Sequence, residues 1–193
     1  MITPIPPGQT VSMNWDQTDQ QGNQVPDGLY GFAIQVFDPD FVLQLICAPV
    51  QVGTSCAAPT QYGFGGAGSG GNVPAITSVG GFPSIGNLAF DVGVSNALGA
   101  APAFLFLSLA DASLDFGFAT VWVDPNLLFL TLTTTLGGAP GTAGAGIGFF
   151  GTPIPNNAGL IGLEFFGQIF VSDPMANGGL SHTEGLRVGI CPA

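Results

Sequence analysis

The sequence predicts an all-β protein, a β-sandwich of Ig-like or jelly-roll-like type with a small N-terminal β-hairpin region. Its apolar runs are short, rich in Val, Ile, Phe, Leu and Thr, and end at Gly, Pro, Asn or Asp, which is typical of strands. Almost no segment repeats its apolar residues with the 3.6-residue period of an amphipathic helix. The 193 residues also include 31 Gly and 16 Pro, which favour turns. Many short strands separated by turns favour a sandwich or a barrel.

The expected strands follow one another along the whole chain. They are residues 10–15, 29–37, 41–50, 75–79, 87–94, 103–109, 116–123, 127–135, 144–150, 160–171 and 185–190. The sequence GFGGAGSGG at residues 63–71 is too rich in glycine for the interior of a strand, so a linker is expected at residues 63–73. This linker would separate an N-terminal hairpin and arm region, residues 1–62, from a sandwich domain, residues 74–193.

The charge of the chain excludes several classes of function. There is no lysine and a single arginine, Arg187, and the net charge is −11. A nucleic-acid interface and a polybasic membrane-surface helix both need several cations, so neither is expected. The most apolar stretch, residues 92–110, is interrupted by polar residues and a proline, which predicts two strands and a turn in place of a transmembrane helix. Residues 1–9 carry three prolines and no basic residue, so no signal peptide is expected there.

Charged residues are also unevenly distributed. Residues 41–90 and residues 125–163 contain no charged side chain. Strands of monomeric sandwiches usually carry Lys, Glu or Arg at water-facing positions, partly to prevent pairing between sheet edges. Either neutral polar residues and glycine solvate these tracts, or other subunits cover them. We favour the second interpretation.

The cysteines indicate an oxidising environment. Cys47 and Cys56 are nine residues apart, which suits a disulfide across a short hairpin or loop, and this pairing is the expected one. Two buried free thiols are the alternative. Cys191 is then left free, paired between subunits, or the true partner of one of the other two. Three cysteines without a C-x-x-C pair, with one histidine, do not form a zinc site.

Residues 14–32, NWDQTDQQGNQVPDGLYGF, resemble the terminal hairpin of bacterial Ig-like modules of the flagellar hook-capping type. The pattern of those modules is W-D-G-x-D-x-x-G-x-x-V-P-x-G-x-Y, and Gln17 replaces its first glycine. The matching residues are Trp15, Asp16, Asp19, Gly22, Val25, Pro26, Gly28 and Tyr30. The resemblance implies a structural module of a secreted surface protein.

Residues 76–190 resemble an uncharacterised β-rich domain at the C-termini of secreted proteins of planctomycetes and myxobacteria. The matching residues are Ile154, Pro155, Asn156, Leu160, Gly162, Phe166, Gln168, Asp173 and Pro174, with Glu184-Gly185-Leu186 near the end. This resemblance implies secretion and a β-sandwich, and it implies no chemistry. The chain departs from that family in its near absence of Lys and Arg.

No catalytic residue and no cofactor are expected. His182 is next to Ser181 in LSHTEG, but neighbouring strand residues point to opposite faces, so the two cannot form a local dyad. Glu164, in the apolar run LIGLEFFGQIF, is an outward-facing carboxylate, a buried acid, or the partner of Arg187. The ion pair Glu164–Arg187 is the most economical interpretation.

Other binding chemistries are weaker candidates. The glycine-rich tracts lack the Lys of a P-loop. Calcium could bind the oxygen cluster of Asp16, Asp19, Asn23 and Asp27, although the spacing is not that of an EF-hand and the hairpin motif accounts for these residues. Glycan binding needs an exposed Trp or Tyr, whereas Trp122 in FATVWVDP follows a core-like alternation.

The sequence therefore predicts an extracellular, non-catalytic structural protein that assembles with copies of itself, as a filament, sheath or surface-layer subunit. Assembly would use apolar faces and strand addition at open sheet edges. The extended, proline-containing arm of residues 1–9 is suited to cross to a neighbour. The alternative is a secreted carbohydrate-binding or adhesion module.

Overall fold

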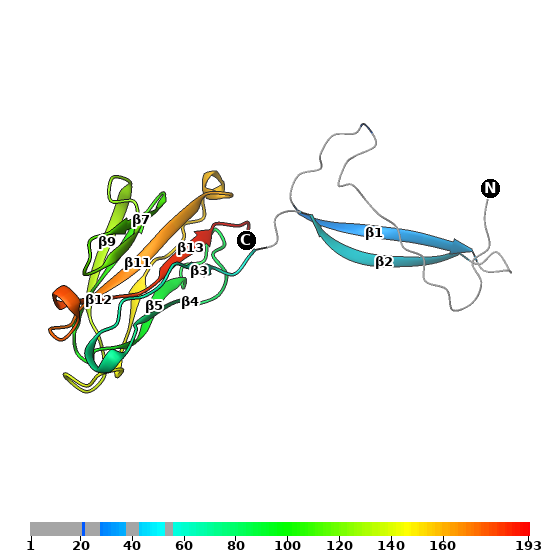
Figure 1. Ribbon diagram of the computed structural model, residues 1–193. Helices are drawn as coiled ribbons and strands as arrows, with labels where there is room; N and C mark the ends of the chain where they lie inside the picture. The colour runs from blue at the N-terminus through cyan, green and yellow to red at the C-terminus, as the bar shows by residue number, and fades with distance from the viewer. Residues whose placement is uncertain (1–20, 22–27, 38–42, 53–55) are drawn as a thin grey trace. The chain divides into compact units, whose positions relative to one another are not determined.

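The structure is a computed structural model that describes residue 21 and residues 28–37, 43–52 and 56–193 (Figure 1). The chain divides into two compact units, Met1–Gly53 and Thr54–Ala193. The arm of residues 1–9, the strand expected at residues 10–15 and most of the hook-capping resemblance lie outside the described residues. The same holds for the four candidate calcium ligands, Asp16, Asp19, Asn23 and Asp27.

The described residues of the first unit form one antiparallel strand pair. Strand β1 (Gly28–Phe37) pairs with β2 (Leu43–Val52) in an unbroken register from Gly28↔Val52 to Phe37↔Leu43. The strands expected at residues 29–37 and 41–50 are thus present, with ends that differ by one or two residues.

The second unit consists of short strands and three single-turn 3₁₀ helices. The strands are β3 (Thr60–Tyr62), β4 (Ala75–Val79), β5 (Asp91–Ala97), β6 (Pro102–Ser108), β7 (Asp111–Asp115), β8 (Thr120–Val123), β9 (Leu128–Thr135), β10 (Gly146–Gly151), β11 (Glu164–Ser172), β12 (Leu180–His182) and β13 (Gly185–Gly189). The 3₁₀ helices are η1 (Ser69–Gly71), η2 (Ala158–Leu160) and η3 (Asn177–Gly179).

These strands form two main sheets and one separate hairpin, all antiparallel. The larger sheet has the order β3-β13-β11-β6-β9, with the short β12 also paired to β11 (Figure 1). The smaller sheet has the order β10-β5-β4, and β7 pairs with β8 alone. The expected all-β fold is confirmed.

The core lies between the inner faces of the two sheets. On β6 the side chains of Ala103, Leu105 and Leu107 are buried in it, while Phe104 and Phe106 alternate to the outer face. The smaller sheet contributes Ile76, Val92 and Val94, and the larger sheet also contributes Ile169, Val171, Leu186 and Val188. Two sheets that bury facing apolar sides make a β-sandwich.

One predicted strand is broken by a turn. Residues 116–123 were expected to be continuous, but only β8 is extended, and residues 116–119 form the turn of the β7–β8 hairpin. Gly117 adopts a φ of +78°, and its N–H donates to Asp115 Oδ1 at 2.7 Å. A glycine at positive φ with an aspartate that accepts locally ends the strand. The sequence analysis did not predict the short strands β3, β7 and β12.

The glycine-rich segment is not a linker. The boundary between the units lies at residues 53 and 54, and the expected linker, residues 63–73, belongs to the second unit. Gly66 forms a bridge with His182. A Cβ atom on Gly63 would overlap the ring of Trp122, and one on Gly66 would overlap the ring of His182. Glycine occurs here because the backbone passes directly over two buried aromatic rings.

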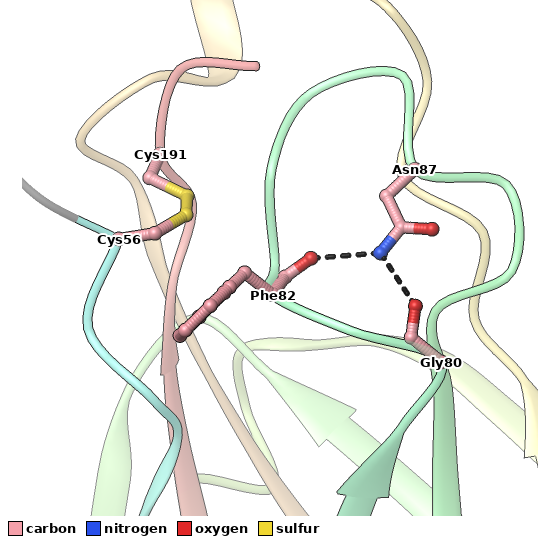
Figure 2. Close-up of a disulfide and its surroundings, with 5 residues drawn as sticks. All are labelled: Cys56, Gly80, Phe82, Asn87 and Cys191. Carbon is pink, nitrogen blue, oxygen red and sulfur yellow. Dashed lines mark hydrogen bonds between the residues drawn. A yellow bond between two sulfur atoms is a disulfide. The ribbon is translucent and has the colours of Figure 1, made fainter.

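The disulfide joins Cys56 to Cys191, so the expected pairing of Cys47 with Cys56 is wrong (Figure 2). Strand β13 runs antiparallel to β3 with Leu186↔Gln61 and Arg187↔Thr60. Continuing this register by four residues brings Cys191 opposite Cys56, and their Cα atoms lie 5.3 Å apart. Cys47 belongs to β2 in the other unit. The pairing follows from the sheet register, which spacing along the chain does not reveal.

A loop beside the disulfide holds the C-terminal segment. The N–H of Cys191 donates to the Pro83 carbonyl at 3.1 Å, and the Cys191 carbonyl accepts from Ile85 N–H at 2.9 Å. Asn87 keeps this loop closed, because its Nδ2 donates to the carbonyls of Gly80 and Phe82 at 3.0 and 2.8 Å (Figure 2).

Among the described residues, no helix has both the length and the hydropathy needed to cross a lipid bilayer.

Candidate functional site

The β7–β8 hairpin packs on the outer face of the larger sheet, and Gln168 of β11 holds it there. The side chain of Gln168 is fully buried. Its Oε1 accepts from the N–H of Trp122 at 2.8 Å, and its Nε2 donates to the carbonyl of Thr120 at 2.9 Å. One amide side chain thus pairs with the backbone of β8 much as a neighbouring strand would. The sequence analysis treated Gln168 only as a motif match, although a lone amide within an apolar strand already suggests a buried polar contact.

His182 fixes the same strand from a second side. It is 3% exposed, and its Nε2 accepts from the N–H of Thr120 at 3.3 Å. Its Nδ1 lies 3.0 Å from the Thr183 carbonyl, which can only accept, so we assign the ring proton to Nδ1. The register places Ser181 opposite Val171 and His182 opposite Phe170, so the two side chains point to opposite faces. Both ring nitrogens of His182 are engaged, Nε2 with the backbone of β8 and Nδ1 with the carbonyl of Thr183.

Trp122 of β8 is enclosed by aromatic residues and the glycine-rich segment. Trp122 is 9% exposed, and its indole Nε1–H donates to the Phe64 carbonyl at 2.8 Å. The hydroxyl of Tyr62 donates to the backbone carbonyl of Trp122 at 2.6 Å. Phe64 and Tyr62 both meet the ring edge to face, with centroids 4.9 and 6.2 Å away. Burial, reinforced by the charge of Asp111, raises the pKa of Tyr62 far above its usual value. Trp122 is thus a core residue, as the alternation in the sequence indicated.

A pocket of about 520 Å³ opens between the hairpin and the sheet. We call it the phenylalanine pocket. Its lining contains no charged or polar side chain and consists of Phe104, Phe106, Phe116, Phe118, Ala119, Val121, Val123, Pro125, Leu128, Phe170 and Leu180. Phe116 and Phe118, in the turn of the hairpin, are 57% and 44% exposed. The sequence analysis did not find this pocket, because it depends on how a hairpin lies across a sheet.

A second apolar surface follows the open edge of the sandwich. Strand β9 pairs with β6 on one side, and within the described part of the chain no strand pairs with its other side. Phe129 and Leu130 on β9 are 50% and 38% exposed. On β10, the edge strand of the smaller sheet, Ile147 and Phe149 are about half exposed as well. We call these four side chains and the backbone of β9 the open edge.

The predicted ion pair between Glu164 and Arg187 is present. Arg187 Nε and Nη2 donate to Glu164 Oε1 and Oε2 at 3.0 and 2.8 Å, and both side chains are about half exposed. The carboxylate raises the pKa of the Arg187 guanidinium. Because water and salt screen an exposed pair of this kind, it contributes little to stability. It neutralises the one cationic side chain of the sequence.

A buried aspartate organises the end of the glycine-rich segment. Asp173 is 1% exposed, and its carboxylate accepts from the N–H and the hydroxyl of Ser69, both at 2.6 Å, and from the N–H of Met175 at 3.1 Å. Burial alone would raise the pKa of Asp173, but these hydrogen bonds outweigh it and lower the pKa below its usual value. This residue, too, was only a motif match in the sequence.

The structure brings together no metal site within the part of the chain that it describes. No group of three or more His, Cys, Asp or Glu side chains there could hold an ion. The calcium hypothesis concerned residues outside that part.

No family model and no curated protein matches this sequence. The phenylalanine pocket and the open edge are the two surfaces of the second unit that are suited to binding.

Proposed function

We propose that this protein is an extracellular, non-catalytic structural subunit that assembles with copies of itself into a filament, sheath or surface layer. The observation that carries the proposal is the open edge. A long edge strand with exposed apolar side chains is a template for strand addition, and monomeric proteins usually protect such edges with lysines, prolines or bulges. Here β9 has eight residues, no charge and no proline, and the whole tract of residues 125–163 is uncharged. Its pairing with β6 shifts register once, between Leu128 and Leu130, and is regular from Leu130 to Thr135.

Assembly at this edge has a sufficient driving force. Added strands would satisfy the unpaired backbone groups of β9, while Phe129, Ile147 and Phe149 would be withdrawn from water. Burial of about 1,000 Å² of apolar surface is worth on the order of 25 kcal/mol before the cost of association. Exposed apolar side chains that gather on one surface mark interaction sites more often than scattered ones do.

The extracellular location is supported by the Cys56–Cys191 disulfide, since disulfides persist mainly in oxidising compartments. Enzymatic activity is disfavoured because His182 and Gln168 are both committed to holding β8. The alternative, carbohydrate binding, needs an exposed Trp or Tyr platform. Trp122 is buried and Tyr62 is partly buried, so the described residues of the second unit favour assembly over glycan binding.

The test introduces the edge-protecting charges that the sequence lacks. In the variant Thr131→Lys/Thr133→Lys, two exposed positions of β9 carry a cation each. Thr142→Lys, at an exposed position in the loop after β9, adds one lysine off the edge and serves as the control. Sedimentation velocity at micromolar concentration and negative-stain electron microscopy should show assemblies for the wild type and the control, and a monomer for the double variant. A wild type that sediments as a monomer under these conditions would contradict the proposal.

A further inference from the structure

The phenylalanine pocket supports a second activity that does not depend on assembly. We propose that it binds an uncharged hydrocarbon ligand, such as the chain of a neutral lipid. The pocket lies under the β7–β8 hairpin on the outer face of the larger sheet, and its lining presents carbon atoms alone.

The pocket is formed before any ligand enters. Gln168 and His182 hold Thr120 and Trp122 of β8 from below. At the other end of the hairpin, the hydroxyl of Ser108 donates to the Asp124 carbonyl at 2.9 Å. A hairpin fixed at both ends keeps its distance from the sheet, so little conformational cost is added on binding.

The lining determines the chemistry of the ligand. A hydroxyl, amide or carboxylate moved from water into a site without hydrogen-bond partners loses about 1–3 kcal/mol or more. This cost argues against a sugar, and it argues against a peptide strand whose backbone groups would be unpaired. The floor of the pocket includes Phe106 and Phe170, which meet edge to face with centroids 5.8 Å apart. Such a surface favours aliphatic or aromatic carbon.

The surrounding charges argue that the ligand is not an anion. Asp115 precedes the lining residue Phe116, and Asp124 lies between the lining residues Val123 and Pro125. No lysine exists to attract a carboxylate, and Arg187 is paired with Glu164. With a net charge of −11, the protein would repel a fatty-acid carboxylate more than the corresponding alcohol.

The size of the pocket fits a small molecule. Ligand pockets usually measure about 300–1,000 Å³, and an apolar cavity of about 150 Å³ already accepts benzene. At about 520 Å³ the phenylalanine pocket is in this range. Phe116 and Phe118 line the pocket and are half exposed, so the pocket is open to solvent beside them.

The experiment titrates the full chain with N-phenylnaphthylamine, an uncharged probe that fluoresces in apolar sites. The wild type should bind it saturably at one site per chain. Val121→Trp fills the pocket, and Phe116→Asp places a carboxylate at a lining position whose side chain is half exposed. Each should weaken binding by about tenfold or more, equivalent to at least about 1.4 kcal/mol. Phe149→Ser removes an apolar side chain of similar exposure on β10, outside the pocket, and should leave binding unchanged.

Competition distinguishes the ligand classes. Decanol should displace the probe at lower concentration than decanoate does. The proposal is overturned by an absence of saturable binding, by equal competition from decanoate, or by a Val121→Trp variant that binds as the wild type does. It is also overturned if Val121→Trp changes the sedimentation of the protein without changing probe binding, since a second copy would then be the occupant. A Val121→Trp variant that loses probe binding but sediments as the wild type does would separate this activity from assembly.

Discussion

Removing the Cys56–Cys191 disulfide should destabilise the second unit strongly. The bridge closes a loop with a sequence separation of 135. The loop-closure relation gives an entropy of about 17 cal/mol/K for such a loop, or about 5 kcal/mol at 25 °C. A bridge between Cys47 and Cys56, nine residues apart, would contribute only about 3 kcal/mol by the same relation. The magnitude of the loss therefore reports on the pairing.

The assay is thermal and urea unfolding of Cys56→Ser, Cys191→Ser and Cys47→Ser, with and without reductant. The first two variants should each lower the melting temperature of the second unit by about 10–20 °C under non-reducing conditions. Cys47→Ser should leave that transition unchanged, because Cys47 belongs to the first unit. Reduced wild type should resemble the first two variants. The Cys56–Cys191 pairing would be contradicted if Cys47→Ser and Cys56→Ser were equally destabilised while Cys191→Ser was stable. Recovery of a Cys47–Cys56 fragment by peptide mapping without reductant would contradict it as well.

Three further predictions concern the packing around the β7–β8 hairpin and the glycine-rich segment. Gln168→Met should lower the free energy of unfolding in urea by about 2–4 kcal/mol, because it leaves backbone groups of buried β8 without hydrogen-bond partners. Amide hydrogen exchange in β8 should accelerate. An unchanged exchange rate would contradict the role of Gln168 in holding β8. Gly63→Ala should destabilise the second unit several times more than Gly71→Ala. Both residues have a φ near +75°, but only at position 63 would the added Cβ overlap the ring of Trp122. Equal melting temperatures of the two variants would contradict this clash. The lowered pKa of Asp173 implies a contribution to the free energy of unfolding that is complete above about pH 4, the pKa of an unfolded aspartate, and is lost as the pH falls through the folded pKa. Asp173→Asn should therefore weaken the dependence of stability on acid pH, measured as urea midpoints from pH 2 to 7. The same pH dependence in the variant and the wild type would contradict this contribution.

Much of the fold could be predicted from the sequence, because local pattern governs strands. Residues 75–79 form β4 as expected, and residues 127–135 form β9 within one residue of the prediction. The short strands β3 and β12, of three residues each, carry too little pattern to be seen. They are strands because their backbone groups pair with those of neighbouring strands, β3 with β13 and β12 with β11.

Long-range geometry explains the errors. The glycine-rich segment has the composition of a flexible linker, yet Gly63 and Gly66 are glycine because of Trp122 and His182, which are far away in sequence. The Cys56–Cys191 pairing requires knowing that β3 and β13 are neighbours. The ion pair was predicted correctly because a single cation leaves few alternatives. The phenylalanine pocket escaped notice because its residues come from segments that contact one another only after the hairpin folds across the sheet.

The disulfide also determines how the second unit bears mechanical load. Cys56 and Cys191 are close to the two ends of that unit, and their Cα atoms are 5.3 Å apart. A tensile force applied between residue 54 and residue 193 would pass through the covalent bond and bypass every strand between them. The strands of the sandwich would carry no load, and the unit would not extend under force until the disulfide was reduced.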